Sequence, residues 1–594
     1  MPGAVSLGKF RAVNAAAEIS PIRATGRHAR DASSRSGSRL LSRVLQSWVP
    51  WLAVVIGFLL IVGPVAATLL RSIITSDTEL TLPSLANFAK LLNNPGMAEA
   101  VGNTLATGIG VTLISSVLGC TLAWIVVRTD IGGRRWFEVL NLVPFFLSPY
   151  VGAMSWLYFA APNAGIVQKL VKPYAPHLLD WLNLYSIGGV IWVLSLFYTP
   201  YIYLFVIGPM RSMDGALEDA ARVHGARFWT TTRAITLPLI MPALLSGALI
   251  VLVTSAGLFD VPLALASPRA IHTIPTDIYG AVQYPTDFGY AAALGTLTMV
   301  ATMLCSLFQQ RYVRSRRFDT VSGKGYRPRP VRLSPAGRIG AYTIETLYLA
   351  MGVVLPLMAL IMVSLSSLWT GTFNPSRITF ANFRYVWFNY GLTQQALQNS
   401  LFLAAVGATI GVTLGMLQAY FVRRRGGRIA RIVEPVLSLP LGIPGIIIGL
   451  GFLILLIRTP LYSTIWIMLI AYVAHFFPFA MRSISAMLLS LNPELEQSAR
   501  ASGATWLQTM RYVVLPLLRP ALTASWLMLF VIFIRELGAS ILLYAQGTET
   551  ISVVLVVLSE RNFGYVAALA VTQLMLLLGA FALFARKGAS ILER

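Results

Sequence analysis

Long apolar segments recur along this chain, and they limit its possible folds more than any other feature. A helix needs about 20 apolar residues to cross the hydrocarbon core of a membrane, and twelve such segments occur in the 594 residues. Inside a bilayer the backbone must satisfy its own hydrogen bonds, which favours helices. The sequence therefore predicts an all-α polytopic membrane protein. The twelve expected spans lie near 48–71, 101–127, 136–160, 187–208, 235–258, 288–310, 341–366, 397–421, 431–457, 462–483, 512–534 and 563–585.

The composition agrees with a membrane protein and excludes a soluble one. Hydrophobic residues make up 56% of the chain and charged residues only 12%, whereas charged residues are about 25% of a soluble domain. The formal net charge is +23. In a soluble protein this excess would suggest nucleic acid as a partner. Here the positive-inside rule explains it, so we expect a lipid environment and no nucleic-acid partner.

Basic residues concentrate in the loops that follow even-numbered spans. Arg128, Arg134 and Arg135 follow the second span, and the stretch 423–431 after the eighth span holds five arginines. The stretch 311–338 after the sixth span holds nine basic residues and one acid. Because cytoplasmic loops carry such an excess, both chain termini are expected in the cytoplasm.

The first 45 residues differ from the rest of the chain. They are rich in Ala, Ser and Arg and show no periodicity. We expect a disordered basic cytoplasmic tail, although organellar transit peptides have a similar composition. No short apolar segment precedes the first span, so that span is expected to serve as an uncleaved signal anchor.

The chain is an internal duplication. The stretch from Leu217 to Leu244 matches the stretch from Leu495 to Leu522 at an offset of 278 residues, with 14 of 28 positions identical and no gap. A second set of matches, at an offset of 296 residues, includes Asn103 with Asn399 and Arg128 with Arg424. Each half then holds six spans, and an even number of spans gives the halves the same orientation.

This duplication defines the expected domains. They are the tail (1–45), a first six-helix repeat (46–312), a basic cytoplasmic linker (313–338) and a second six-helix repeat (339–588). Parallel repeats of this kind are related by an axis along the membrane normal.

The matched stretches lie between the fourth and fifth spans of each half, on the side expected to be cytoplasmic. Each begins with a segment that lacks Gly and Pro, which favours a short helix. Gly225 and Gly503 follow, and glycine suits a helix end because it readily takes a positive φ. The pairs Leu237-Pro238 and Leu515-Pro516 then start or kink the next span. We call the segments 217–238 and 495–516 the first and second docking loops.

The docking loops resemble the loop motif of type I ABC importer permeases, and the resemblance covers the chain from about residue 50 onward. The motif has an acid and two small residues, then Gly, then an aliphatic residue and Leu-Pro. In that family the loop forms a coupling helix that sits in a groove of the ATPase subunit. The resemblance implies ATPase-docking residues at Glu218, Asp219, Ala220, Ala221 and Gly225, and at Glu496, Gln497, Ser498, Ala499 and Gly503.

Two departures from the motif concern its acid. The position of the family's usual Glu is Asp219 in the first loop and Gln497 in the second, and Glu218 and Glu496 stand just before. The two loops are therefore expected to contact the ATPase unequally. The alternative, a solvated amphipathic connector, gives no reason for the spacing and the Gly position to recur in both halves.

The chain is not expected to be an enzyme. A phosphate-binding loop needs GxxxxGK followed by Ser or Thr, and Gly323-Lys324-Gly325 does not supply it. The resemblance therefore implies two copies of a separate ABC ATPase subunit, which bind ATP and magnesium, and no cofactor in this chain. It also implies a bacterial inner membrane and a periplasmic or lipid-anchored solute-binding protein.

Ionisable residues inside spans are candidates for the substrate path. The strongest are Arg535 and Glu536 at the end of the eleventh span, and Asp260 at the matching place in the first half. The alternative, equally weighted, is that they are interfacial residues, snorkelling or capping helices. Asn103 and Asn399 are expected to form interhelical hydrogen bonds. The five histidines show no ligand spacing, so no metal site is expected.

The fused layout, with GLFDVPLAL in one half and RELGAS in the other, resembles ferric-iron importer permeases most. Permeases for thiamine and 2-aminoethylphosphonate share that layout, and a polyamine is a further alternative substrate. A secondary transporter driven by an ion gradient would be a different class of protein. It predicts several charged residues in mid-span, and few are present here.

Overall fold

The computed structural model describes residues 28–74, 83–162, 164–175, 177, 183–213, 215–315, 331–372 and 374–592. These residues form helices joined by loops, with two isolated β-bridges among them. Ten helices are long and apolar enough to cross a membrane, and the number rises to twelve if each of two bent helix pairs is one span. The predicted all-α polytopic fold is confirmed.

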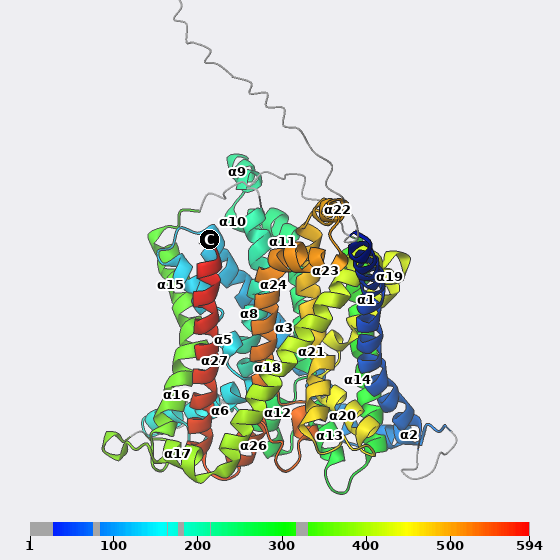
Figure 1. The fold of residues 1–594 in the computed structure, drawn as a ribbon. Helices are drawn as coiled ribbons and strands as arrows, with labels where there is room; N and C mark the ends of the chain where they lie inside the picture. The colour runs from blue at the N-terminus through cyan, green and yellow to red at the C-terminus, as the bar shows by residue number, and fades with distance from the viewer. Residues whose placement is uncertain are drawn as a thin grey trace, which may run out of the picture. The chain divides into compact units, whose positions relative to one another are not determined.

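The helices follow the duplication (Figure 1). Those before the linker are α1 (His28–Ile73), α2 (Ala86–Asn93), α3 (Met97–Arg128), α4 (Arg134–Leu140), α5 (Val143–Phe146), α6 (Pro149–Ala160), α7 (Ile166–Val171), α8 (Ile187–Ser212), α9 (Gly215–Val223), α10 (Phe228–Thr231), η1 (Thr232–Thr236), α11 (Leu237–Ala256), α12 (Asp260–Leu265), η2 (Ser267–Arg269), α13 (Ile274–Val282) and α14 (Phe288–Ser315). Those after it are α15 (Pro335–Leu349), η3 (Ala350–Val354), α16 (Leu355–Ser364), η4 (Pro375–Arg377), α17 (Ala381–Arg384), η5 (Tyr385–Asn389), α18 (Gly391–Tyr420), η6 (Phe421–Arg425), α19 (Gly427–Leu437), η7 (Leu439–Gly442), α20 (Gly445–Leu456), α21 (Ile465–Ser490), α22 (Glu494–Ala501), α23 (Trp506–Thr509), η8 (Met510–Val514), α24 (Leu515–Arg535), α25 (Ser540–Leu543), α26 (Ile551–Ser559) and α27 (Phe563–Leu592).

The described chain divides into two compact units. Among the described residues, the smaller consists of 28–49 and Pro493–Pro516, and it contains the second docking loop. The larger consists of Pro50–Asn492 and Leu517–Arg594. The larger unit therefore holds most of the membrane-spanning residues, together with the first docking loop.

Within the larger unit, corresponding helix pairs form the centre of each half. The most extensive contacts join α3 to α8 and α18 to α21. A Cβ at Gly119 would lie 2.7 Å from Cβ of Ile202, and one at Gly415 would lie 2.8 Å from the backbone nitrogen of Met481. Both crossings are therefore too close for any side chain, as is common where membrane helices pack through small residues.

The third and ninth spans are broken. Arg134–Phe146 meets Pro149–Ala160 at 96°, and Gly427–Gly442 meets Gly445–Leu456 at 104°. Prolines at the breaks cannot donate a backbone hydrogen bond and do not continue a preceding helix. The sequence predicted continuous spans at 136–160 and 431–457, with interruptions at Pro440, Pro444 and Gly445 tolerated. The correction is that each span turns by roughly a right angle at its break.

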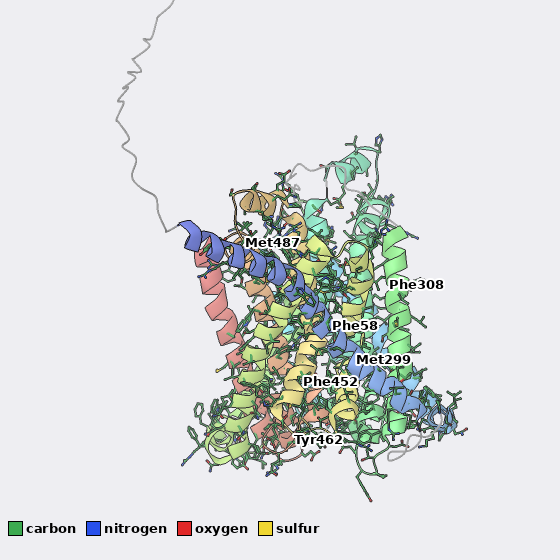
Figure 2. All side chains as sticks on the ribbon, turned by 45° about the vertical axis from the view of Figure 1, so that its right-hand side comes forward. Phe58, Met299, Phe308, Phe452, Tyr462 and Met487 are labelled. Carbon is green, nitrogen blue, oxygen red and sulfur yellow. The ribbon has the colours of Figure 1, made fainter. Side chains whose placement is uncertain are left out.

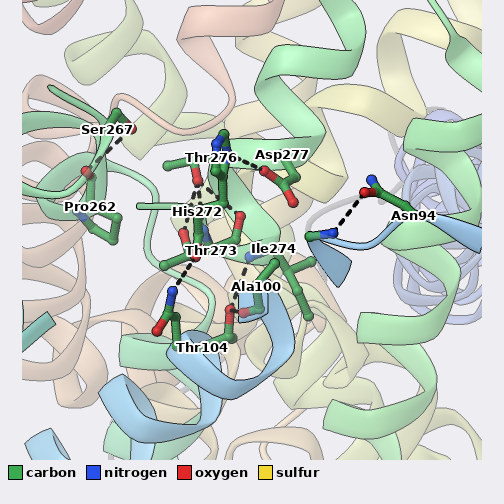
Figure 3. Close-up of polar contacts among 12 residues, drawn as sticks. Asn94, Ala100, Thr104, Pro262, Ser267, His272, Thr273, Ile274, Thr276 and Asp277 are labelled. Atoms are coloured by element: carbon green, nitrogen blue, oxygen red, sulfur yellow. Dashed lines mark hydrogen bonds and ion pairs between the residues drawn. The ribbon is translucent and has the colours of Figure 1, made fainter. Parts of the chain in front are cut away.

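The duplication extends to individual hydrogen bonds. Asn103 Nδ2 donates to the carbonyl of His272 at 2.9 Å, and Asn399 Nδ2 donates to that of Glu549 at 2.9 Å. One residue further on, Thr104 accepts from the Ile274 amide at 2.9 Å, as Ser400 accepts from the Ile551 amide at 2.9 Å. Figure 3 shows the Thr104 bond at the start of α13. Both asparagines therefore bond from a helix to a carbonyl in the loop just before α13 or α26, whereas the sequence predicted bonds between two helices.

The first span of each half packs against the other half. In α1, Trp51 lies 4.6 Å from the ring of Phe421, and the Ala53 carbonyl accepts from Gln418 Nε2 at 2.9 Å. In α15, Tyr348 donates to the Leu196 carbonyl of α8 at 3.2 Å. Figure 2 shows Phe58 midway along α1. The side chain of Phe58 is 47% exposed, as expected of a lipid-facing residue.

Two predicted segments lie partly outside the described residues. Residues 1–27 of the expected tail and 316–330 of the expected linker are not described. Helix α1 begins at His28, inside the segment expected to be irregular. No proline interrupts the chain between Pro21 and Pro50, so the helix of the first span can extend backwards by adding one hydrogen bond per residue.

Candidate functional site

A cavity of about 170 Å³ lies in the larger unit where the two broken spans meet. Pro144, Leu147 and Pro149 of the third span line it, as do Pro440 to Ile446 of the ninth. Its other walls come from α8, α11, α12, α21 and α24, so both halves contribute. All three residues proposed for the substrate path, Asp260, Arg535 and Glu536, line this one cavity.

Arg535 connects the second half to the first. Its guanidinium donates to the carbonyls of Phe145 and Leu147, the latter at 3.3 Å, and to the hydroxyl of Tyr201 at 3.3 Å. It also lies 4.8 Å from the centre of the Phe145 ring, a cation–π contact. The break at Pro149 frees these carbonyls from helical bonding. Arg535 therefore holds the bend of the third span in place.

Glu536 is 8% exposed and caps the short helix α25. Its carboxylate accepts from the amides of Ala539 at 2.8 Å and Ser540 at 3.2 Å, and from the Ser540 hydroxyl at 2.8 Å. Asp260 is 5% exposed in the first turn of α12, and both Arg535 and Glu536 act on it electrostatically. Arg535 and Glu536 therefore both make structural contacts, and Glu536 caps a helix. Helix capping was the alternative to a substrate-path role that the sequence left open.

The first docking loop forms a short helix and a glycine turn. Helix α9 ends at Val223, Gly225 has a φ of +82°, and the Ala226 amide donates to the Ala221 carbonyl at 2.9 Å. This six-to-one bond around a left-handed glycine is a Schellman motif. A Cβ on Gly225 would meet nothing within 4 Å. The glycine is thus required by backbone conformation and not by space, as the sequence predicted.

Glu218 points inward from α9, and sequence reasoning did not foresee this. It is 5% exposed, and its carboxylate pairs with Arg128, which is 1% exposed at the end of α3. Thr236 donates to its other oxygen at 2.7 Å. Asp219 and Ala220 are exposed on the same helix. The first docking loop therefore uses one acid to fasten itself to the span and presents the next to solvent.

The second docking loop, in the smaller unit, has the same pattern. Glu496 is 8% exposed, Gln497 and Ser498 are exposed, and Ala499 is half-buried. Gly503 has a φ of +84°, and the Ala504 amide donates to the Ala499 carbonyl at 3.1 Å. Each loop then continues into a five-residue π-helix, η1 or η8, directly before its Leu-Pro pair. Prolines at these positions lack the donor that an α-helix would use.

The end of the linker is fastened to the same end of α3. The Val331 amide donates to the Arg128 carbonyl at 2.7 Å, and the Leu333 amide donates to Asp130 at 3.1 Å. Arg338 also pairs with Asp130, at 2.9 Å. The Leu333 bond, followed by Arg338, holds the pKa of Asp130 below its ordinary value. One short segment, Arg128 to Asp130, thus contacts both α9 and the end of the linker.

Sequence reasoning missed several residues of this site. Tyr198, Tyr201 and His475 line the cavity, but single aromatic residues inside apolar spans carry no signal. Arg128 and Arg424 recur at equivalent positions and were interpreted only as orientation charges. In the described part of the chain, no group of three or more His, Cys, Asp or Glu side chains is placed to hold a metal ion.

Comparisons with known proteins identify relatives of both halves of the chain. Residues 115–318 and 411–588 both match the family described as "Binding-protein-dependent transport system inner membrane component". A putative ferric transport system permease protein of Haemophilus influenzae is 25% identical over 480 residues, which cover 77% of this chain and 72% of that protein. A putative 2-aminoethylphosphonate transport system permease protein of Salmonella paratyphi A is 29% identical over 231 residues, covering 39% of this chain and 86% of that one.

One similar solved structure is a bacterial alginate ABC transporter in complex with an alginate pentasaccharide-bound periplasmic protein. The match covers 51% of this chain and 100% of the chain in that structure. Its identity is 20% and its TM-score is 0.35. The family match covers most of both halves. The chain therefore belongs to the inner-membrane components of binding-protein-dependent transport systems, as a multi-pass ABC importer permease that transports, does not catalyse and carries no cofactor of its own.

Proposed function

We propose that two copies of an ABC ATPase subunit dock on this chain, one on each docking loop, and that they drive import through the cavity. The recurring exposure pattern supports this most directly. In each loop an inward acid is followed by two exposed residues, Asp219 and Ala220 or Gln497 and Ser498. Small exposed side chains let another protein surface approach closely. ATP and magnesium then bind on the partner, whose closure moves both loops between two states.

Co-purification tests the docking. A tagged chain in mild detergent should bring down the ATPase, and the double variant Gly225→Arg with Gly503→Arg should not, because both turns then carry a long side chain in a left-handed conformation. Membrane insertion should be unchanged. Normal uptake in the double variant would contradict the proposal, and so would a wild-type chain that purifies without any ATPase.

For the substrate we propose ferric iron, delivered by a periplasmic or lipid-anchored binding protein. The name of the Haemophilus relative supports it, as do two carboxylates, Asp260 and Glu536, on the cavity wall. Uptake of radioactive iron by cells with and without the chain tests it. Thiamine, 2-aminoethylphosphonate or a polyamine taken up in place of iron would reassign the substrate and leave the machinery intact.

The proposed orientation places both termini and both docking loops in the cytoplasm. Labelling of single cysteines tests it, in a variant that lacks Cys120 and Cys305. Tyr462 lies between α20 and α21 and is 43% exposed (Figure 2). An impermeant thiol reagent should label Tyr462→Cys in cells with a permeabilised outer membrane, and Arg332→Cys only after lysis. The reverse pattern would invert the topology.

A further inference from the structure

Three buried polar side chains from three elements meet away from the cavity. They are Asn141, between α4 and α5, Tyr203 on α8 and Glu345 on α15, with exposed fractions of 1%, 1% and 0%. Helix α5 packs on α8, and both pack on η3, which continues α15. The cluster therefore joins the first half to the first span of the second. Sequence reasoning passed over Glu345, although an acid inside an apolar span is a functional candidate.

No polar atom of this cluster completes a hydrogen bond of ordinary geometry within the described residues. The unpaired atoms are both oxygens of Glu345, the oxygen and nitrogen of the Asn141 carboxamide, and the Tyr203 hydroxyl. The Asn141 carboxamide is close enough to interact with both Glu345 and Tyr203. Nearly all buried polar groups in proteins are paired, so five unpaired atoms in one place indicate an occupant.

The charges around the cluster limit what that occupant can be. Glu345 is faced by Tyr203 on α8 and by Tyr348 on its own helix. Glu138 on α4 and Arg211 on α8 also act on Tyr203, but they form a half-exposed ion pair with each other at 2.5 Å. No described cation pairs with Glu345. The carboxylate repels an anion, and water alone would leave its charge buried, which is strongly unfavourable.

A proton fits better than a metal ion. Calcium takes about six to eight oxygen ligands and magnesium about six, whereas the three side chains offer four oxygens. We propose that this cluster is a proton-binding site in which Glu345 is a neutral acid paired with Asn141. The Glu345 O–H donates to Asn141 Oδ1, and Asn141 Nδ2 donates to the other Glu345 oxygen. The second amide hydrogen of Asn141 reaches the Tyr203 hydroxyl, so all five atoms are paired.

Because of this pairing, the contact between α15 and the first half depends on whether Glu345 is protonated. With the proton bound, α15 seats against the first half through a complete set of hydrogen bonds. Without it, a lone carboxylate remains in an apolar contact and favours separation of α15 from α8. This site does not depend on the identity of the substrate or of the ATPase partner.

Infrared difference spectroscopy of the full-length protein in lipid nanodiscs tests the site directly. The wild type minus Glu345→Gln spectrum at neutral pH should contain the C=O stretch of a protonated carboxyl, and that stretch should shift in an Asn141→Leu background. A difference spectrum with carboxylate bands in its place would overturn the proposal. If Glu345→Gln does not fold, the wild type minus Asn141→Leu spectrum gives the decision, because the stretch of a protonated carboxyl bonded to Asn141 shifts between them and that of an ionised Glu345 is absent.

Thermal unfolding supplies a second measurement. Glu345→Gln should unfold at the wild-type temperature at neutral pH, because a glutamine keeps the shape and the hydrogen-bonding capacity of the neutral acid. Raising the pH should destabilise the wild type but leave Glu345→Gln unchanged. Stabilisation of the wild type by sodium or potassium, absent in Glu345→Gln, would instead assign the site to a metal ion and overturn the proposal.

Discussion

At the scale of single residues, the first docking loop shows how one motif serves two roles. Local sequence gave two adjacent acids, Glu218 and Asp219, and no means of ranking them. The structure separates them, because successive residues on a helix point about 100° apart. Glu218 meets Arg128, which lies 90 residues earlier. Such a partner cannot be found from the motif alone. The recurrence of Arg128 and Arg424 at an offset of 296 residues was a signal for both arginines, but it was interpreted only as a marker of orientation.

Removing the buried acid should destabilise the loop. Glu218→Gln leaves Arg128 buried and uncompensated, and breaking such a pair costs about 3–5 kcal/mol. We expect faster proteolysis within 215–238 and loss of ATPase co-purification. The control is Asp219→Asn, an exposed change that should keep the wild-type proteolysis rate. Equal protease resistance in Glu218→Gln and wild type would contradict the pairing.

Arg535 should be needed for transport but not for assembly. Its guanidinium contacts two carbonyls and a hydroxyl at once, which the single ammonium of lysine cannot reproduce. Arg535→Lys should lose about 1.5–3 kcal/mol per hydrogen bond forfeited, and uptake should fall by at least tenfold while ATPase co-purification persists. Arg519→Lys, an exposed change on the same helix, is the control. Full uptake in Arg535→Lys would show that the bend of the third span needs no such contact.

At the scale of elements, the glycine turns can be separated from the helices that precede them. Alanine at Gly225 meets no atom within 4 Å but must adopt a φ of +82°, which costs about 1–2 kcal/mol. Gly225→Ala should therefore weaken ATPase binding measurably, and Gly225→Asn should weaken it less, because asparagine tolerates this conformation. Binding assays with purified ATPase compare the two. If Gly225→Ala and Gly225→Asn weaken ATPase binding equally, the cause would be the added side chain and not the backbone conformation.

The attachment of the linker's end to α3 should depend on the charge of Asp130. Its pKa is lowered in the folded state, so its contribution is complete above the unfolded pKa of about 3.9 and is lost as the pH falls through the folded value. Asparagine is uncharged at every pH, so Asp130→Asn should behave at any pH as the wild type behaves when Asp130 is protonated. Cleavage by protease within 331–342 should thus rise in the variant at neutral pH, and in wild type only under acid. An unchanged cleavage rate would mean that the backbone bond from Val331 to Arg128 suffices.

Element boundaries were predictable where composition sets them, and less so where geometry does. Apolar length alone predicted the spans. The prolines at 440 and 444 indicated an interruption in the ninth span but not its angle of 104°. An angle depends on what fills the bend. In the third span the bend is held by Arg535, which lies 390 residues away from Phe145 in sequence.

At the scale of the whole molecule, the duplication was the most informative prediction. It gave two parallel halves and equivalent asparagines, and the structure reproduces both the helices and the bonds of Asn103 and Asn399. It did not give the packing of each first span on the opposite half, because pairings between distant segments leave no local pattern. The departures from symmetry are where function can differ between halves. Thr236 supports Glu218, for example, whereas the matching position of the second loop is Val514.

The two docking loops should therefore contribute unequally to transport. The exposed residue that follows the inward acid is Asp219 in the first loop and Gln497 in the second. If each meets a basic surface of the same ATPase, only the first contact gains from charge attraction, which salt screens within about 10 Å at 0.1 M. Asp219→Lys should reduce ATPase binding and uptake more than Gln497→Lys, and Asp219→Gln should make binding less sensitive to salt. Titrations of ATPase binding at low and high salt measure both effects. Equal losses from the two lysine variants, with the same salt dependence, would mean that the loops are interchangeable despite their sequences.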